Sequence, residues 1–254
     1  MKLSYDFSLH ELHGSLHLDG VQLGSYSFTG DIQVTLGPKG MLMLGAGSLN
    51  TGTLLVQGFG TFNTGMLFGN APLTPENITT VTEYSKAAQN ICWLNDNKEI
   101  FKGFFLTGGY DVLNEHDGFD IGIASVYFNA VLGIEASIGA NFAKKDYMAL
   151  IGAHGDLDAG LDAITGTSIS GGLHAHLTAM GSYSPSGFAV DGDAGVTVNF
   201  TVSQYIPIVG TKSISASKGA MILFGLGGGK SAHVDFSISD DGNVVPCADN
   251  TPKP

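Results

Sequence analysis

The sequence predicts an all-β, predominantly antiparallel protein: a long-stranded meander sheet or sandwich with one packed α-helix near residues 75–95, built as a single domain over 1–254. Three observations predict this fold class. Glycine is abundant, at 37 of 254 residues, as in chains with many turns. In the first part of the chain, turn signals recur about every 8–12 residues. Three later segments alternate apolar and polar residues, which is the period of a half-buried strand.

The first part of the chain, residues 3–69, alternates strand-like segments with Gly, Asn and Pro-Lys-Gly. GPKG at 37–40 predicts a tight turn, because Pro38 presets φ at the second turn position. This succession of strands and turns indicates antiparallel neighbours joined by hairpins.

Residues 75–95 interrupt the strand pattern and predict one helix. Thr74 is a suitable N-cap, and Pro75 suits the first helical position, where a missing N–H costs no hydrogen bond. Mostly apolar residues then recur every three or four positions, so one side of the helix is expected to pack on the sheet. This stripe consists of Ile78, Val81, Ser85, Ala88 and Cys92.

Residues 100–245 return to strand patterns, and the tail 246–254 is expected to be loose. Three segments, 150–164, 169–181 and 188–203, alternate apolar and polar side chains almost without error. Hairpins at TGTS and SYSPSG would join these segments as neighbours. The sequence leaves open whether the chain is a piece of a longer protein.

Charge and composition argue against several classes of function. The net charge is −12 and all 11 basic residues are Lys, whereas Arg is the usual bidentate ligand of phosphates and base edges. Nucleic-acid partners are therefore not expected, and an anionic membrane surface would repel the chain. FGLGGGKSAH at 224–233 lacks the first Gly of a phosphate-binding loop and leads into a strand pattern, so no cofactor is expected.

Cys92 and Cys247 are the two cysteines, too few for a disulfide framework or a zinc motif. The sequence leaves open whether they pair, and buried thiols are the commoner state of isolated cysteines. The first residues alternate and carry charges, so no secretory signal is expected in this chain. The fold class nevertheless favours an extracellular, cell-surface or particle-associated location.

Asp158, His176 and Asp193 are the candidate site residues. If the hairpins fold about 166–167 and 184–185, the three side chains lie within about one residue of a single row, where neighbours are about 4.5–5.5 Å apart. An Asp-His-Asp row could bind a metal ion or hold a protonated histidine. The favoured interpretation is a solvated polar face, because an open sheet lacks the walls of a pocket, and catalysis is not expected.

The sequence thus favours a non-enzymatic structural or interaction module, a building block or domain of a larger surface, secreted or particle-like assembly. Its expected partners are other proteins or further copies, joined through unpaired strand edges. The first alternative is an outer-membrane β-barrel, a pore or transporter, which is the one form in which membrane contact is expected. The alternation favours it, but aromatic girdles are not evident and a helix interrupts the strands. A metal- or pH-sensing Asp/His face is the second alternative.

Overall fold

The structure is a computed structural model, and it describes residues 1–23, 26–50, 61–83, 85, 87–120, 124–163, 165–227 and 230–239. These residues form one antiparallel sheet of 12 strands that follow one another in chain order. The predicted all-β meander is therefore confirmed. The strands are β1 (Lys2–Asp6), β2 (Glu11–Leu23), β3 (Tyr26–Gly37), β4 (Gly40–Asn50), β5 (Thr61–Gly69), β6 (Gly103–Asp120), β7 (Ala124–Asn141), β8 (Asp146–Ala163), β9 (Thr167–Ser184), β10 (Gly187–Ile206), β11 (Gly210–Gly227) and β12 (Lys230–Ser239).

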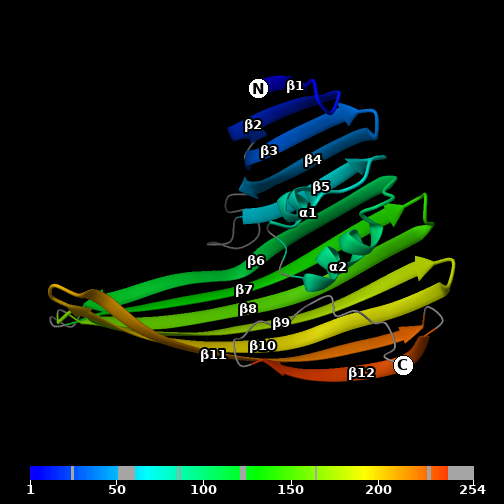
Figure 1. The fold of residues 1–254 in the computed structure, drawn as a ribbon. Coiled ribbons are helices and arrows are strands. Elements are labelled where there is room, and N and C mark those ends of the chain that lie inside the picture. The colour runs from blue at the N-terminus through cyan, green and yellow to red at the C-terminus, as the bar shows by residue number, and fades with distance from the viewer. Residues whose placement is uncertain are drawn as a thin grey trace.

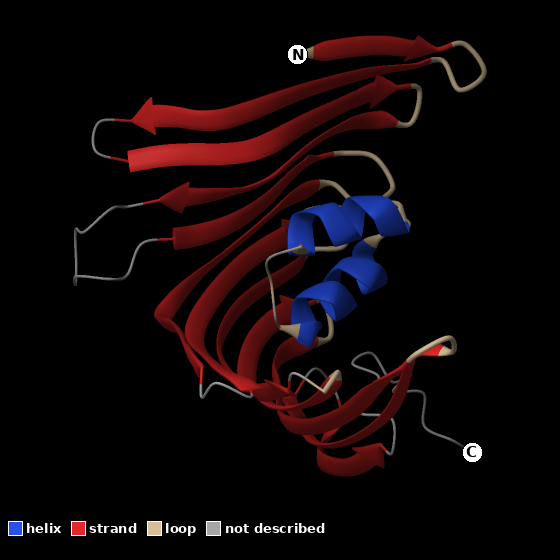
Figure 2. Cartoon of the chain, turned by 90° about the vertical axis from the view of Figure 1, so that its left-hand side faces the viewer, coloured by secondary structure: helices blue, strands red, loops and turns tan. Residues whose placement is uncertain are grey.

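The sheet is curved, and its two helices lie in the hollow of the curve (Figures 1 and 2). We call the side that carries the helices the inner face and the opposite, convex side the outer face. Within the described residues β1 pairs with β2 alone and β12 with β11 alone, so the sheet is open at both edges. None of the helices described is long and apolar enough to cross a lipid bilayer.

The predicted single helix is two helices, α1 (Pro75–Thr82) and α2 (Ala88–Asn97). The predicted N-cap is confirmed, since the Thr74 hydroxyl accepts a hydrogen bond from the Asn77 N–H at 3.2 Å. The helix breaks where Ser85 turns inward and donates to Glu135 of β7 at 3.2 Å. Serine side chains compete with helical backbone bonds in this way, and the apolar periodicity did not reveal it.

The core lies between the helices and the inner face of the sheet. Trp93 of α2 stacks on Phe105 of β6, with ring centroids 6.2 Å apart. Two strand glycines let the helices approach: a Cβ at Gly65 would lie 1.9 Å from the Val81 carbonyl oxygen, and one at Gly139 would lie 2.8 Å from the Trp93 ring. The buried cluster consists of Leu42, Leu44, Leu67, Ala71, Leu73, Ile78, Val81, Ala87, Trp93, Leu94, Phe101, Phe105, Met148, Leu150 and Met180.

Of the two cysteines of the sequence, only Cys92 lies within the described residues. Cys92 of α2 is half-buried and disulfide-bonded, so it is not the free thiol that is common for an isolated cysteine. Cys247 lies outside the described residues, as does the whole of the tail 246–254.

Candidate functional site

The register of β8, β9 and β10 decides where the predicted site residues lie. On the inner face, Asp158 is opposite Gly172, which is two polar rows from His176 along β9. Asp193 is opposite Thr178, which is one polar row from His176 in the opposite direction along β9. The three candidates therefore occupy three different rows of the inner face. The cause is that the β8–β9 hairpin is centred on residue 165 and the β9–β10 hairpin on 185–186. Both centres differ from the assumed ones, and a turn sets the register of its whole hairpin.

Close His–Asp pairs nevertheless form across these strands. His176 Nε2 lies 2.6 Å from Oδ2 of the fully buried Asp193. His174 Nδ1 lies 2.8 Å from Oδ1 of Asp156, and its Nε2 lies 3.8 Å from Oδ1 of Asp158. The structure thus joins two of the three candidates and places Asp158 beside a different histidine.

Sequence reasoning did not single out His154 or the glycines that accommodate these rings. His154 is buried, and its Nε2 lies 3.6 Å from Oδ1 of Asp111 on β6. A Cβ at Gly133 would lie 2.4 Å from the His154 ring, and a Cβ at Gly195 would lie 2.3 Å from the His176 ring. Each ring therefore lies over a glycine of the adjoining strand, a relation that appears only once the register is known.

The His–Asp pairs act as ties between strands. In the described part of the chain, no three His, Cys, Asp or Glu side chains converge in a way that could hold a metal ion. Opposite polar groups on neighbouring strands stabilise a sheet without further chemistry. The inner face therefore gives a structural account of its histidines and aspartates.

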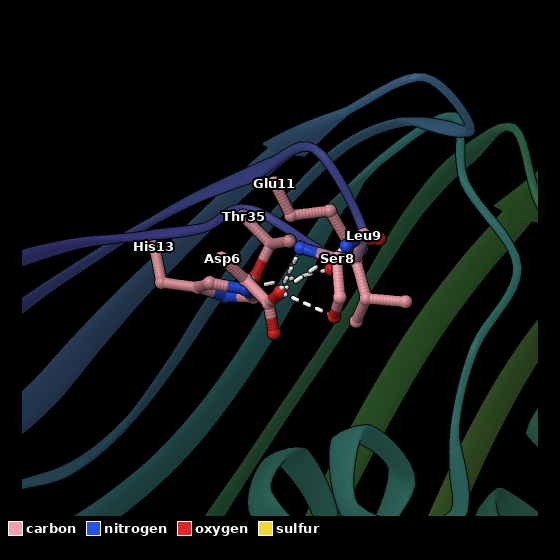
Figure 3. A network of polar contacts seen from close by, with 6 residues as sticks. All are labelled: Asp6, Ser8, Leu9, Glu11, His13 and Thr35. Carbon is pink, nitrogen blue, oxygen red and sulfur yellow. Dashed lines mark hydrogen bonds and ion pairs between the residues drawn. The ribbon is translucent and has the colours of Figure 1, made fainter.

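A second polar network closes the β1–β2 hairpin (Figure 3). The Asp6 carboxylate accepts hydrogen bonds from the Ser8 hydroxyl at 2.6 Å, the Ser8 N–H at 2.8 Å and the Leu9 N–H at 3.1 Å. The hydrogen bond from the Ser8 hydroxyl, followed by those from the two backbone N–H groups, lowers the pKa of Asp6. Ser8 and Leu9 are exposed and Asp6 is half-buried, and the cluster belongs to the turn.

The Asp6 hairpin is expected to open at low pH. A carboxylate with a lowered pKa contributes stability above its ordinary pKa of about 3.9 and loses that contribution as the pH falls through the folded value. Amide shifts of Ser8 and Leu9, followed by NMR, should therefore stay constant down to about pH 4 and move below it. The Asp6→Asn variant keeps an acceptor oxygen without the titration, so its shifts should stay flat; equal movement in both chains would contradict the assignment.

The outer face of β7–β10 is a second surface, and it is apolar and exposed. Ile151 is 68% exposed, Phe188 is 62% exposed and Leu177 is 55% exposed. This reverses the expected arrangement, in which the polar side is solvated and the apolar side packed. The large exposed side chains of this outer apolar surface are Phe128, Leu132, Ile134, Ile138, Tyr147, Ile151, Leu157, Ile169, Leu173, Leu177, Tyr183, Phe188, Val196, Val198 and Phe200.

An aromatic row borders this surface at the end of the strands nearest the helices. Phe68 contacts Phe104 at 6.3 Å between ring centroids, and Phe104 contacts Phe142 at 6.2 Å. Phe142 contacts Tyr147 at 6.4 Å, and Tyr147 contacts Tyr183 at 6.3 Å. These rings come from β5, β6, β8, β9 and the β7–β8 turn, so the row is dispersed in the sequence and forms only in the folded sheet.

An apolar hairpin tip lies at the opposite end of the strands, between β10 and β11. Ile206, Ile208 and Val209 are exposed there, and Ile208 has a φ of 78°. A β-branched residue at positive φ is a conformational outlier that costs about 1–3 kcal/mol. The tip therefore keeps an exposed isoleucine at a position that glycine or asparagine would occupy with less strain.

Comparison with known proteins provides no further guide to the function. No family model, no curated protein and no solved structure matches this chain. The fold defines the chain as an open antiparallel meander sheet with two helices on its inner face. The two faces of this sheet differ in chemistry, the inner one polar and partly covered by the helices and the outer one apolar and exposed.

Proposed function

We propose that this chain is a non-enzymatic interaction module that binds through the outer apolar surface of β7–β10. The observation that carries the proposal is the exposure of this surface on strands of 18 to 20 residues. Soluble monomers seldom expose contiguous apolar patches above a few hundred Å², and larger patches are typical of interaction sites. Burial of a large apolar side chain contributes about 1.5–3 kcal/mol, so covering this surface is strongly favourable.

The His–Asp pairs of the inner face support the same proposal. His154, His174 and His176 each face an aspartate, and the helices cover the end of the sheet beside them. General acid–base catalysis needs a group aimed at a substrate in a concave, water-limited site. Groups that tie strands together fit a scaffold whose binding surface is on the other side.

Two double variants with equal added charge test the proposal. Leu173→Glu with Val198→Glu places two carboxylates in the outer apolar surface, where the wild-type side chains are 41% and 51% exposed. We expect wild-type chain to associate in detergent-free buffer and to bind an apolar dye, and we expect this variant to do both much less. Light scattering after size exclusion and dye fluorescence measure the two effects.

The matched control is Ser170→Glu with Ser215→Glu, which adds the same charge on the inner face of β9 and β11. It should associate and bind dye like the wild type. A wild-type chain that stays monomeric, binds no dye and is unaffected by either variant would refute the proposal. Circular dichroism of each variant shows whether the sheet is retained.

A further inference from the structure

We infer that the outer apolar surface of β7–β10 binds a lipid bilayer and inserts into its surface. This convex part of the sheet is called the crest. This inference rests on the proposed function and names its partner. The bilayer is favoured over another protein and over a second copy of the chain by the side-chain chemistry, the paired backbone and the curvature of the surface.

The chemistry of the crest suits hydrocarbon better than protein. Outer-face positions alternate along each strand, and those of β8 from Tyr147 to Ala163 carry no charged side chain and no polar group except the Tyr147 hydroxyl at the rim. The outer positions of β9 from Ile169 to Tyr183 follow the same rule. Protein interfaces carry about one hydrogen bond per 100–200 Å², and the interior of this surface offers no side-chain donor or acceptor for one.

The backbone of the crest is also compatible with lipid. β7, β8, β9 and β10 each pair along both edges, so their N–H and C=O groups are bonded within the sheet. Hydrocarbon offers no hydrogen bonds, and an unpaired backbone group there would cost several kcal/mol. The open edge at β1 lies six strands from β7, and the open edge at β12 is separated from β10 by β11 (Figure 1).

Charged side chains stand at both ends of one cross-strand row of the crest, while in other rows the apolar outer face continues onto Ile222 of β11 and Phe236 of β12. One cross-strand row runs from Glu115 on β6, through Leu157 and Leu173, to Lys218 on β11. Five strand spacings of about 4.8 Å separate its charged ends, so the apolar stretch of this row is about 24 Å wide. Both end residues are exposed and lie partway along their strands. Charges at that position disfavour a sheet that spans the bilayer and fit one whose flanks lie at the headgroups.

The curvature of the sheet favours a bilayer over a second copy of the chain as the occupant of the outer apolar surface. The outer face is the convex side of the sheet (Figure 2). Two convex faces meet along a narrow zone, whereas a fluid bilayer follows the crest and buries about 5–10 Å of it, as for interfacial helices. The aromatic row from Phe68 to Tyr183 then lies at the interface, where aromatic rings are enriched in membrane-bound proteins.

Flotation of the full chain with phosphatidylcholine vesicles tests this inference. The wild-type chain should float at low and at high salt, because the contact is apolar and the net charge of −12 provides no attraction. L173E/V198E should bind vesicles more than about tenfold less, since two apolar side chains of the crest become charged. The inner-face control S170E/S215E should float like the wild type.

A second variant keeps the test independent of charge. Y147A/Y183A removes two rings of the aromatic row, and we expect it to bind vesicles several-fold less while its circular dichroism is unchanged. Equal flotation of this variant and the wild type would contradict the role of the row. Trp93 lies among the buried core residues, so unchanged Trp fluorescence confirms that the core is intact in every variant.

The failures of the two proposals can be told apart. If wild-type chain associates and binds dye through the outer surface but does not float, the lipid inference is overturned and the proposed function stands. A dimer that L173E/V198E dissociates, with no flotation, would identify a second copy as the occupant. If neither association, dye binding nor flotation depends on the outer surface, both proposals fall.

Discussion

Replacing Phe105 by alanine is expected to lower the free energy of unfolding by about 3–5 kcal/mol, the range for deleting a buried aromatic side chain. Phe105 has no exposed surface and stacks on Trp93, with ring centroids 6.2 Å apart. The change would leave a cavity where the helices meet the inner face. Urea unfolding followed by the fluorescence of Trp93, the one Trp of the chain, measures the loss.

The matched control for this variant is Phe188→Ala. The same atoms are removed from a side chain that is 62% exposed on the outer face. Unfolding in buffer without lipid should change by about 0.5 kcal/mol or less, as for most surface substitutions. Similar losses in both variants would mean that the inner and outer faces are wrongly distinguished.

The strand pattern, the turn at 37–40 and the N-cap at Thr74 could be predicted from the sequence because they depend on local chemistry. Alternation with period 2 groups side chains by face, and the pairing of even positions on β8 and β9 with odd positions on β10 confirms that grouping. The turn at 37–40 and the N-cap at Thr74 are likewise confirmed, since each needs only a few neighbouring residues. The helix break at Ser85 was missed because its partner, Glu135, lies 50 residues further along the chain.

The exposure of each face could not be predicted, because alternation says which residues share a face and not what covers it. The helices pack on the side that also carries His154 and Asp193, so the polar side is partly buried and the apolar side of β7–β10 is exposed. The aromatic row was missed for a related reason. Phe68 and Tyr183 are more than a hundred positions apart in the sequence, and the sheet brings them into one row.

Replacing Asn141 by alanine is expected to have the second large effect on stability, about 3–4 kcal/mol, because each buried partner left unsatisfied costs about 1–3 kcal/mol. Asn141, at the end of β7, has no exposed surface. Its amide donates to Asn97 Oδ1 at 2.8 Å and to the Ile100 carbonyl oxygen at 2.5 Å. Its Oδ1 accepts from the Lys102 N–H at 3.2 Å and the Ala143 N–H at 3.1 Å. One side chain thus joins the end of α2 to β6 and β7.

The control for Asn141 is Asn199→Ala, which removes a half-buried amide that contacts His174 Nε2 at 3.0 Å on the inner face. Its loss should cost about 1 kcal/mol or less, because water can reach the groups left behind. Hydrogen exchange sharpens the comparison: Asn141→Ala should speed exchange in α2 and the first residues of β6, and Asn199→Ala should leave both unchanged. Uniform acceleration across the sheet in Asn141→Ala would show that the amide supports global stability without a local role in holding α2.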